Sequence, residues 1–233
     1  MSQRNSLTIA GKEWKVLRRK KSIIAYIVGL PLILSVLFSL VVKNSIISSG
    51  VIVSNYDLGL QSLTYFFVVF AAILPASIAA YSIVGEKVEK SLEPLLAAPV
   101  TDSEILLGKS IAAFVPPVLA TWAGASIFMA TTDYLTHDLL GFYYFPNWNA
   151  GVMLLLLSPL AAIMSIQLAV ITSSRVSDVR GATQIGSLMF VPFMVIFLAG
   201  VEGTFAFTIP NLLIISAIVL AIDVALFFLS TST

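Results

Sequence analysis

The sequence predicts an all-α, polytopic membrane protein. We expect six transmembrane helices, an N-terminal amphipathic helix at the membrane interface, and a cytoplasmic helix-turn-helix between the second and third spans. Hydrophobic residue types make up 58% of the 233 residues and charged types 11%, with a mean hydropathy of +1.00. A soluble domain has roughly 25% charged residues, so this chain has too little polar surface to be one. We treat residues 1–233 as a single transmembrane domain.

Residues 6–21 predict the interfacial helix. Leu7, Ala10, Trp14 and Leu17 recur at spacings of three and four on one helical stripe, and lysines and arginines occupy much of the remainder. Such a helix can lie in the interface with its cations near anionic lipid head groups. A basic helical flank of the first span, without an interfacial role, is the alternative.

Long charge-free runs predict the transmembrane helices. About 20 apolar residues cross the hydrocarbon core as a helix, and the runs lack the alternation of barrel strands. The six predicted spans are residues 22–42, 61–84, 110–131, 149–173, 183–201 and 209–230.

The distribution of basic residues predicts the orientation. With six spans, twelve of the thirteen lysines and arginines fall on the side of both termini, and only Lys43 falls on the other. Cytoplasmic loops carry such an excess of lysine and arginine. We therefore expect a multi-pass protein of the cell membrane, with both termini and residues 86–109 in the cytoplasm.

Residues 86–109 interrupt the apolar sequence with eight charged side chains, five acidic and three basic. An apolar helical face opposes these charges, and it consists of Val88, Leu92, Leu95 and Leu96. An apolar ridge bordered by charges of both signs suits a groove on a protein partner. A cytoplasmic hairpin without a partner is the alternative.

The second half of this segment predicts a new helix. Pro99 ends the first helix, and Thr101 with Glu104 has the T-x-x-E spacing of a capping box. That helix would continue into the third span, which completes the predicted helix-turn-helix.

Residues for catalysis or metal binding are scarce. The chain has no cysteine and one histidine, His137, which we expect in a solvated outer loop. The stretch "SEILLGKS", residues 103–110, ends like a P-loop, but Ser103 replaces the first glycine and the segment is predicted to be helical. We therefore expect no catalytic residue, metal or cofactor on this chain, no enzymatic activity of its own, and no nucleic-acid partner.

Asp223 is the one carboxylate deep in a predicted span. Such a group is costly in the bilayer and usually faces protein or water. It could relay protons or cations. Alternatively, it is hydrated near the cytoplasmic interface or paired within the helix bundle.

The segment "EKVEKSLEPLLAAPVTDSEILLGK" resembles the cytoplasmic signature of ABC-2 type transporter permeases. That pattern runs E-[RK]-E-x-G-T-L-E-x-L-L-x-[ST]-P-V and continues with E-I-L-x-G-K. The matching residues are Glu86, Leu92, Glu93, Leu95, Leu96, Pro99, Val100, Glu104, Ile105, Leu106, Gly108 and Lys109. The chain departs from the pattern at Lys90, Ser91 and Ala98.

The resemblance implies the membrane subunit of an ATP-binding-cassette transporter, usually an exporter. Residues 86–109 would dock on a separate ATPase subunit, which would bind the ATP and magnesium. A second permease copy, identical or paired, would complete the transporter within the lipid bilayer. The residues that the resemblance assigns to ATPase coupling are Glu86, Leu92, Glu93, Leu95, Leu96, Pro99, Val100, Glu104 and Lys109.

The main alternative is a secondary transporter that uses Asp223 and a proton or ion gradient. Internal inverted repeats and half-helices would support that alternative, and the sequence shows neither clearly.

Overall fold

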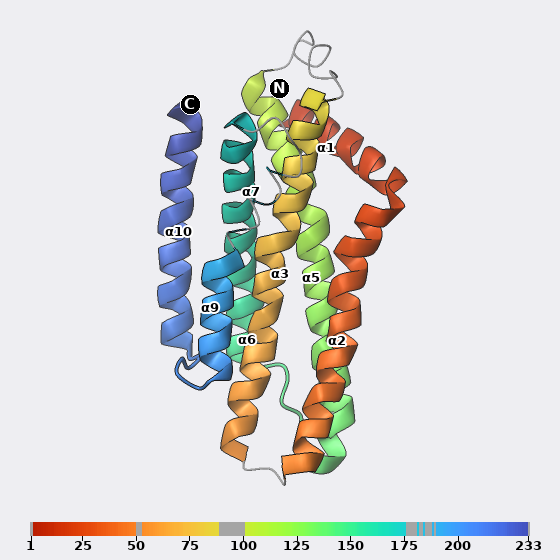
Figure 1. Ribbon diagram of the computed structural model, residues 1–233, viewed down its shortest axis with the longest axis vertical. Coiled ribbons are helices and arrows are strands. Elements are labelled where there is room, and N and C mark those ends of the chain that lie inside the picture. Colours follow the sequence, from red (N-terminus) through yellow and green to blue (C-terminus); the bar gives the residue numbers. More distant parts are fainter. Residues whose placement is uncertain are drawn as a thin grey trace.

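A computed structural model shows a bundle of long helices (Figure 1). It describes residues 2–49, 53–88, 101–175, 181, 184, 188 and 190–232. Within these residues the regular structure is entirely helical, which confirms the all-α prediction. The helices are α1 (Ser2–Arg19), α2 (Lys21–Ser49), α3 (Val53–Val88), α5 (Asp102–Leu140), α6 (Trp148–Val152), a π-helical turn η1 (Met153–Leu157), α7 (Ser158–Arg175), α9 (Phe190–Val201) and α10 (Ile209–Ser232).

Five of the predicted spans coincide with helices that are long and apolar enough to cross a membrane. They are Lys21–Ser48, Tyr56–Ser82, Glu104–Leu140, Trp148–Thr172 and Ile209–Phe228. The remaining predicted span, residues 183–201, is represented by the 12-residue helix α9. Twelve residues extend about 18 Å, less than the roughly 30 Å of hydrocarbon. Most of residues 182–189 lie outside the described part, so this fifth span along the chain stays a prediction.

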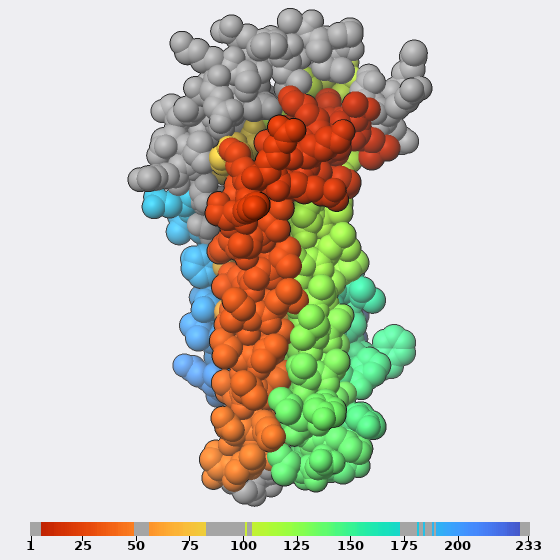
Figure 2. Space-filling view, turned by 90° about the vertical axis from the view of Figure 1, so that its right-hand side faces the viewer, coloured from red at the N-terminus to blue at the C-terminus, as the bar shows by residue number. Residues whose placement is uncertain are grey.

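Helix α1 lies across one end of the bundle, and α10 ends at the same level (Figure 1). Figure 2 shows α1 above α2 and α5, which run side by side below it. The chain leaves α1 at Lys20, whose ammonium lies 4.0 Å from the ring centroid of Tyr81 on α3. Helix α1 includes residues 6–19 of the predicted interfacial helix, whereas its amphipathic character and its location at the membrane interface stay predictions.

Small and hydroxyl side chains bring α2 and α5 close together. A Cβ on Gly124 would lie 2.8 Å from Pro31 Cβ, so only glycine fits there. The Ser39 hydroxyl lies 2.7 Å from the hydroxyl oxygen of Thr131 and 2.9 Å from that of Thr132. Close backbone approach and hydrogen bonds of this kind stabilise helix pairs in membranes.

Helix α3 forms the centre of the bundle. Its buried side chains contribute to three apolar clusters, one shared with α7, α9 and α10, one with α2 and α5, and one with α2, α5 and α7. By contrast, α2 and α10 expose large apolar side chains along much of their length. A membrane-embedded bundle is expected to expose apolar side chains in this way, because lipid tails surround it.

The loop between α5 and α6 is held in place by polar contacts. The Asp133 carboxylate accepts hydrogen bonds from the backbone N–H groups of Tyr144 and Phe145. The Tyr144 hydroxyl donates to Asp57, and burial together with this hydrogen bond raises the pKa of Tyr144. The prediction that His137 lies in a loop was wrong, because this residue lies in the last turn of α5. Its ring stacks on that of Tyr143.

Candidate functional site

The predicted coupling residues divide into two groups in the structure. Glu104 and Lys109 lie on the first turns of α5 with described side chains, and Glu86 lies in the last turn of α3, with only its backbone described. The others lie outside the described residues: Leu92, Glu93, Leu95, Leu96, Pro99 and Val100. The structure therefore describes the end of α3 and the start of α5, which residues 89–100 connect.

Helix α5 begins with the predicted capping box, which is confirmed. Thr101 has an extended backbone, and its side-chain oxygen accepts a hydrogen bond from the Glu104 backbone N–H at 3.4 Å. The Glu104 carboxylate accepts the Thr101 backbone N–H at 3.1 Å. These two bonds satisfy donors that a helix start leaves unpaired, so they fix where α5 begins after residues 89–100.

Gly108 lets α1 pack directly on α5. A Cβ at this position would lie 2.7 Å from the Ser6 carbonyl oxygen and 2.8 Å from Ile9 Cβ. Both neighbours belong to α1, and one is backbone, so a larger residue would move the helix. The Gly108-Lys109-Ser110 sequence that resembles a P-loop ending is thus part of a helix–helix contact, and the helical prediction for residues 103–110 is confirmed.

Lys109 joins three helices at the same level. Its ammonium donates to the Ser82 carbonyl oxygen at 2.8 Å and lies 3.1 Å from the Ser82 hydroxyl oxygen, on α3. It also lies 3.5 Å from a carboxylate oxygen of Glu13 on α1, and the Ser82 hydroxyl donates to the other Glu13 oxygen at 3.1 Å. We call Glu13, Ser82 and Lys109 the junction triad.

Two charged side chains of the junction triad are largely buried, so their contacts matter for stability. The Lys109 side chain is 5% exposed and that of Glu13 is 14% exposed. A buried charge requires a partner, because its lost hydration is otherwise uncompensated. Here the carboxylate balances the charge and Ser82 supplies further hydrogen-bonding oxygens. The arrangement therefore holds α1, α3 and α5 in one relative position.

Trp14 reinforces the contact between α1 and α5. Its indole N–H donates to the Ala112 carbonyl oxygen on α5 at 3.3 Å. This bond lies one helical turn beyond Lys109, so α1 contacts α5 over at least two consecutive turns.

Sequence reasoning found Lys109 but missed Glu13 and Ser82. A signal for Glu13 was present, because it is the first acidic residue in the chain and the next is Asp57. A single acid within a basic helix suggests a specific cationic partner. Ser82 gave no comparable signal, because its contribution depends on where α3 places it.

Asp223 lies apart from the junction triad. It occupies the buried stripe of α10, with Leu212, Ser216 and Val219, and it is 5% exposed. Neither of its carboxylate oxygens has a hydrogen-bond partner within the described residues. The predicted pairing within the bundle is therefore not found there.

The described residues include no group of three or more histidine, cysteine, aspartate or glutamate side chains that could hold a metal ion. Glu13 and Lys109 neutralise each other at the junction triad. The role that this arrangement supports is structural: it connects α1, α3 and α5.

These observations define a class: a polytopic helical membrane protein in which a charged segment connects two helices, α3 and α5, that are joined to each other and to α1. The chain matches the family described as ABC-2 family transporter protein over residues 7–230. It therefore belongs to this family and is an ABC transporter permease, and membership implies pairing with an ATPase subunit. No curated protein matches the chain.

Proposed function

We propose that this chain forms the translocation pathway of an ABC exporter and is driven by ATP hydrolysis on a separate ATPase subunit. In this proposal ATP and magnesium bind the partner, and the chain itself is not an enzyme. Residues 86–109 dock on the ATPase, with Leu92, Leu95 and Leu96 in a groove and acidic side chains around them. Family membership supports the general assignment.

The observation that carries the coupling proposal is the junction triad. Residues 89–100 connect α3 to α5, and the triad joins these two helices to each other and to α1 at the base of that segment. A force applied to the segment would therefore reach three helices together. If α3 and α5 were not joined, movement of a docked ATPase could shift the loop without moving the helices together.

The proposed orientation places this end of the bundle in the cytoplasm of the cell. Cationic residues of α1 and the α1–α2 junction gather there: Lys12, Lys15, Arg18, Arg19, Lys20 and Lys21. An excess of lysine and arginine marks the cytoplasmic side. In this orientation α1 lies in the inner interface, and the predicted coupling segment meets a cytoplasmic ATPase.

A second permease copy, identical or homologous, completes the proposed transporter. The exposed apolar faces of α2 and α10 offer membrane-embedded surfaces for that contact. The mass of the purified assembly and its subunit ratio would measure the number of copies.

Affinity purification of the tagged chain from its native membranes tests the proposal. We expect an ATPase subunit to co-purify, and we expect vesicles with the assembly to transport only when ATP is supplied. Transport without ATP that collapses when the proton gradient is removed would contradict the proposal. That result would favour the alternative, in which the buried Asp223 carboxylate serves a gradient-driven transporter.

A further inference from the structure

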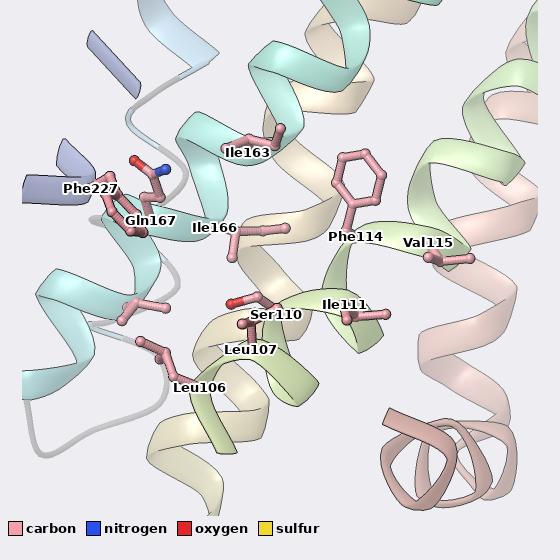
Figure 3. A pocket seen from close by; sticks show the side chains of 11 residues that line it. Leu106, Leu107, Ser110, Ile111, Phe114, Val115, Ile163, Ile166, Gln167 and Phe227 are labelled. Atoms are coloured by element: carbon pink, nitrogen blue, oxygen red, sulfur yellow. The ribbon is translucent and has the colours of Figure 1, made fainter. Parts of the chain in front are cut away.

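A pocket of about 480 Å³ lies between α5, α7 and α10. Leu107 and Phe114 contribute to its wall from α5, Ile163 and Ile166 from α7, and Phe227 from α10. Figure 3 shows Ile163 and Ile166 directed toward Phe114 across the space. The volume falls within the range of roughly 300–1,000 Å³ that is typical of ligand pockets.

The lining of the pocket is too apolar to stabilise many water molecules. Among the described lining side chains, only Ser110 and Gln167 are polar, and none is charged. A buried water needs two to four polar partners, so a pocket of this size could hold few waters. An empty pocket would also deprive its lining of dispersion contacts. A hydrocarbon chain satisfies both conditions.

The mouth of the pocket faces the surface that surrounds the bundle. Leu107 is 55% exposed and Phe227 is 57% exposed, and both line the pocket. Among the described residues, helix α10 packs mainly against α7 and contributes one lining residue, Phe227, opposite the lining residues of α5. Because these helices span a membrane, lipids can reach this opening wherever a second permease copy does not cover α10.

Gln167 adds one polar feature to the wall. Its amide oxygen is buried and has no hydrogen-bond partner within the described residues. This oxygen can only accept a hydrogen bond, so the ester carbonyl of a lipid would not pair with it, and an acyl chain would be held here by apolar contacts. The pocket also begins beside Lys109, at the end of the bundle that carries α1, which places it in one leaflet of the bilayer.

We propose that this pocket binds an acyl chain of a membrane phospholipid from the leaflet on the α1 side. The chain fills the space between the α5 and α7 side chains. This inference requires only that the chain spans a membrane, and it is independent of ATPase coupling.

Photocrosslinking in proteoliposomes tests this proposal. The bilayer contains phosphatidylcholine with a small fraction of a phospholipid that carries a diazirine along one acyl chain. Phe227 and Phe228 provide a matched comparison, because they are neighbours on α10 and are 57% and 66% exposed, but only Phe227 lines the pocket. We expect crosslinks at Phe227 and Ile166 severalfold more often than at Phe228.

A pocket-filling variant sharpens the result. Ser110→Phe adds a ring to the lining, whereas Ser126→Phe adds the same ring to an exposed position on α5 outside the pocket. We expect Ser110→Phe to reduce crosslinking at Ile166 severalfold and Ser126→Phe to leave it unchanged. Both proteins should elute as the wild type does in size-exclusion chromatography.

Three outcomes would overturn the proposal. Equal labelling at Phe227 and Phe228 that Ser110→Phe does not alter would show ordinary lipid contact. Absence of labelling in the pocket would show that another part of the assembly fills it. Labelling by a diazirine fatty acid but not by the phospholipid would assign the pocket to a different amphiphile. Because no ATPase is present, failure of the coupling proposal would leave all three readouts unaffected.

Discussion

Glu13→Gln removes the carboxylate charge from the junction triad while keeping the size and polarity of the side chain. Lys109 then retains its contacts with Ser82 but loses the charge of Glu13. Unit charges 3.5 Å apart attract by about 5 kcal/mol at an effective dielectric constant of 20. Breaking a buried pair costs about 3–5 kcal/mol. Because Glu13 is slightly exposed, we expect the free energy of unfolding to fall by about 3 kcal/mol, at the lower end of that range.

A double-mutant cycle isolates the contribution of the pair. Lys109→Met removes the buried charge but keeps a long unbranched side chain, and Glu13→Gln/Lys109→Met replaces both charges. We expect the double variant to be at least about 1 kcal/mol more stable than the sum of the single effects predicts. Lys15→Gln, at an exposed position on α1, is the matched control and should change stability by less than about 0.5 kcal/mol.

Unfolding by sodium dodecyl sulfate in mixed micelles provides the free energies. With the other two tryptophans, Trp122 and Trp148, replaced by phenylalanine in every variant, Trp14 serves as a local probe, because its indole N–H bonds to Ala112 when α1 is docked. We expect its emission to shift to longer wavelength at a lower detergent fraction in Glu13→Gln than in the wild type. Additive single effects, or an unfolding free energy within about 0.5 kcal/mol of the wild type, would refute the assigned role of the triad.

Three further predictions concern the contact at Gly108, the role of Asp223 and the orientation in the membrane. Gly108→Ala should displace α1 and reduce ATP-driven transport more than ATP hydrolysis. Gly11→Ala is the control, because its Cβ would meet no atom within 4 Å, and it should have neither effect. Equal behaviour of the two variants in paired transport and hydrolysis assays would contradict the close contact. Asp223→Asn should lower transport modestly and leave its ATP dependence intact in vesicle assays, whereas complete loss of transport together with its pH dependence would favour the secondary transporter. A single cysteine at Lys90 should react only with reagents that enter the cell and one at Asp138 with impermeant reagents, and the opposite pattern would overturn the orientation.

Five spans were predictable because their apolar runs match the thickness of the hydrocarbon core. The boundaries were less accurate, because helices extend beyond charge-free runs when charged ends protrude. Lys43 illustrates this extension, since it lies inside α2, which continues to Ser49. The capping box was also predictable, because it depends on two residues three positions apart.

The partners of Lys109 could not be predicted in the same way. Glu13 is 96 residues away in the sequence and Ser82 is 27 residues away, as the separations of the contacting residues show. Such contacts depend on how α1 crosses the bundle, which no local pattern specifies. Gly108 illustrates the same limit, because its sequence context resembled a P-loop while its role is close packing against α1.

Co-purification of the ATPase with Leu95→Asp/Leu96→Asp protein tests the central claim most directly. Burial of one leucine contributes roughly 1.5–3 kcal/mol, and each aspartate would also add an unpaired charge at the contact. Losses of this size correspond to about tenfold or more in affinity, so ATPase recovery should fall sharply although the variant still inserts into the membrane. Charge reversal at Glu93 should reduce recovery less, because exposed ion pairs contribute only about 0–1 kcal/mol. Undiminished ATPase recovery together with full transport by the double variant would contradict the coupling role of residues 86–109.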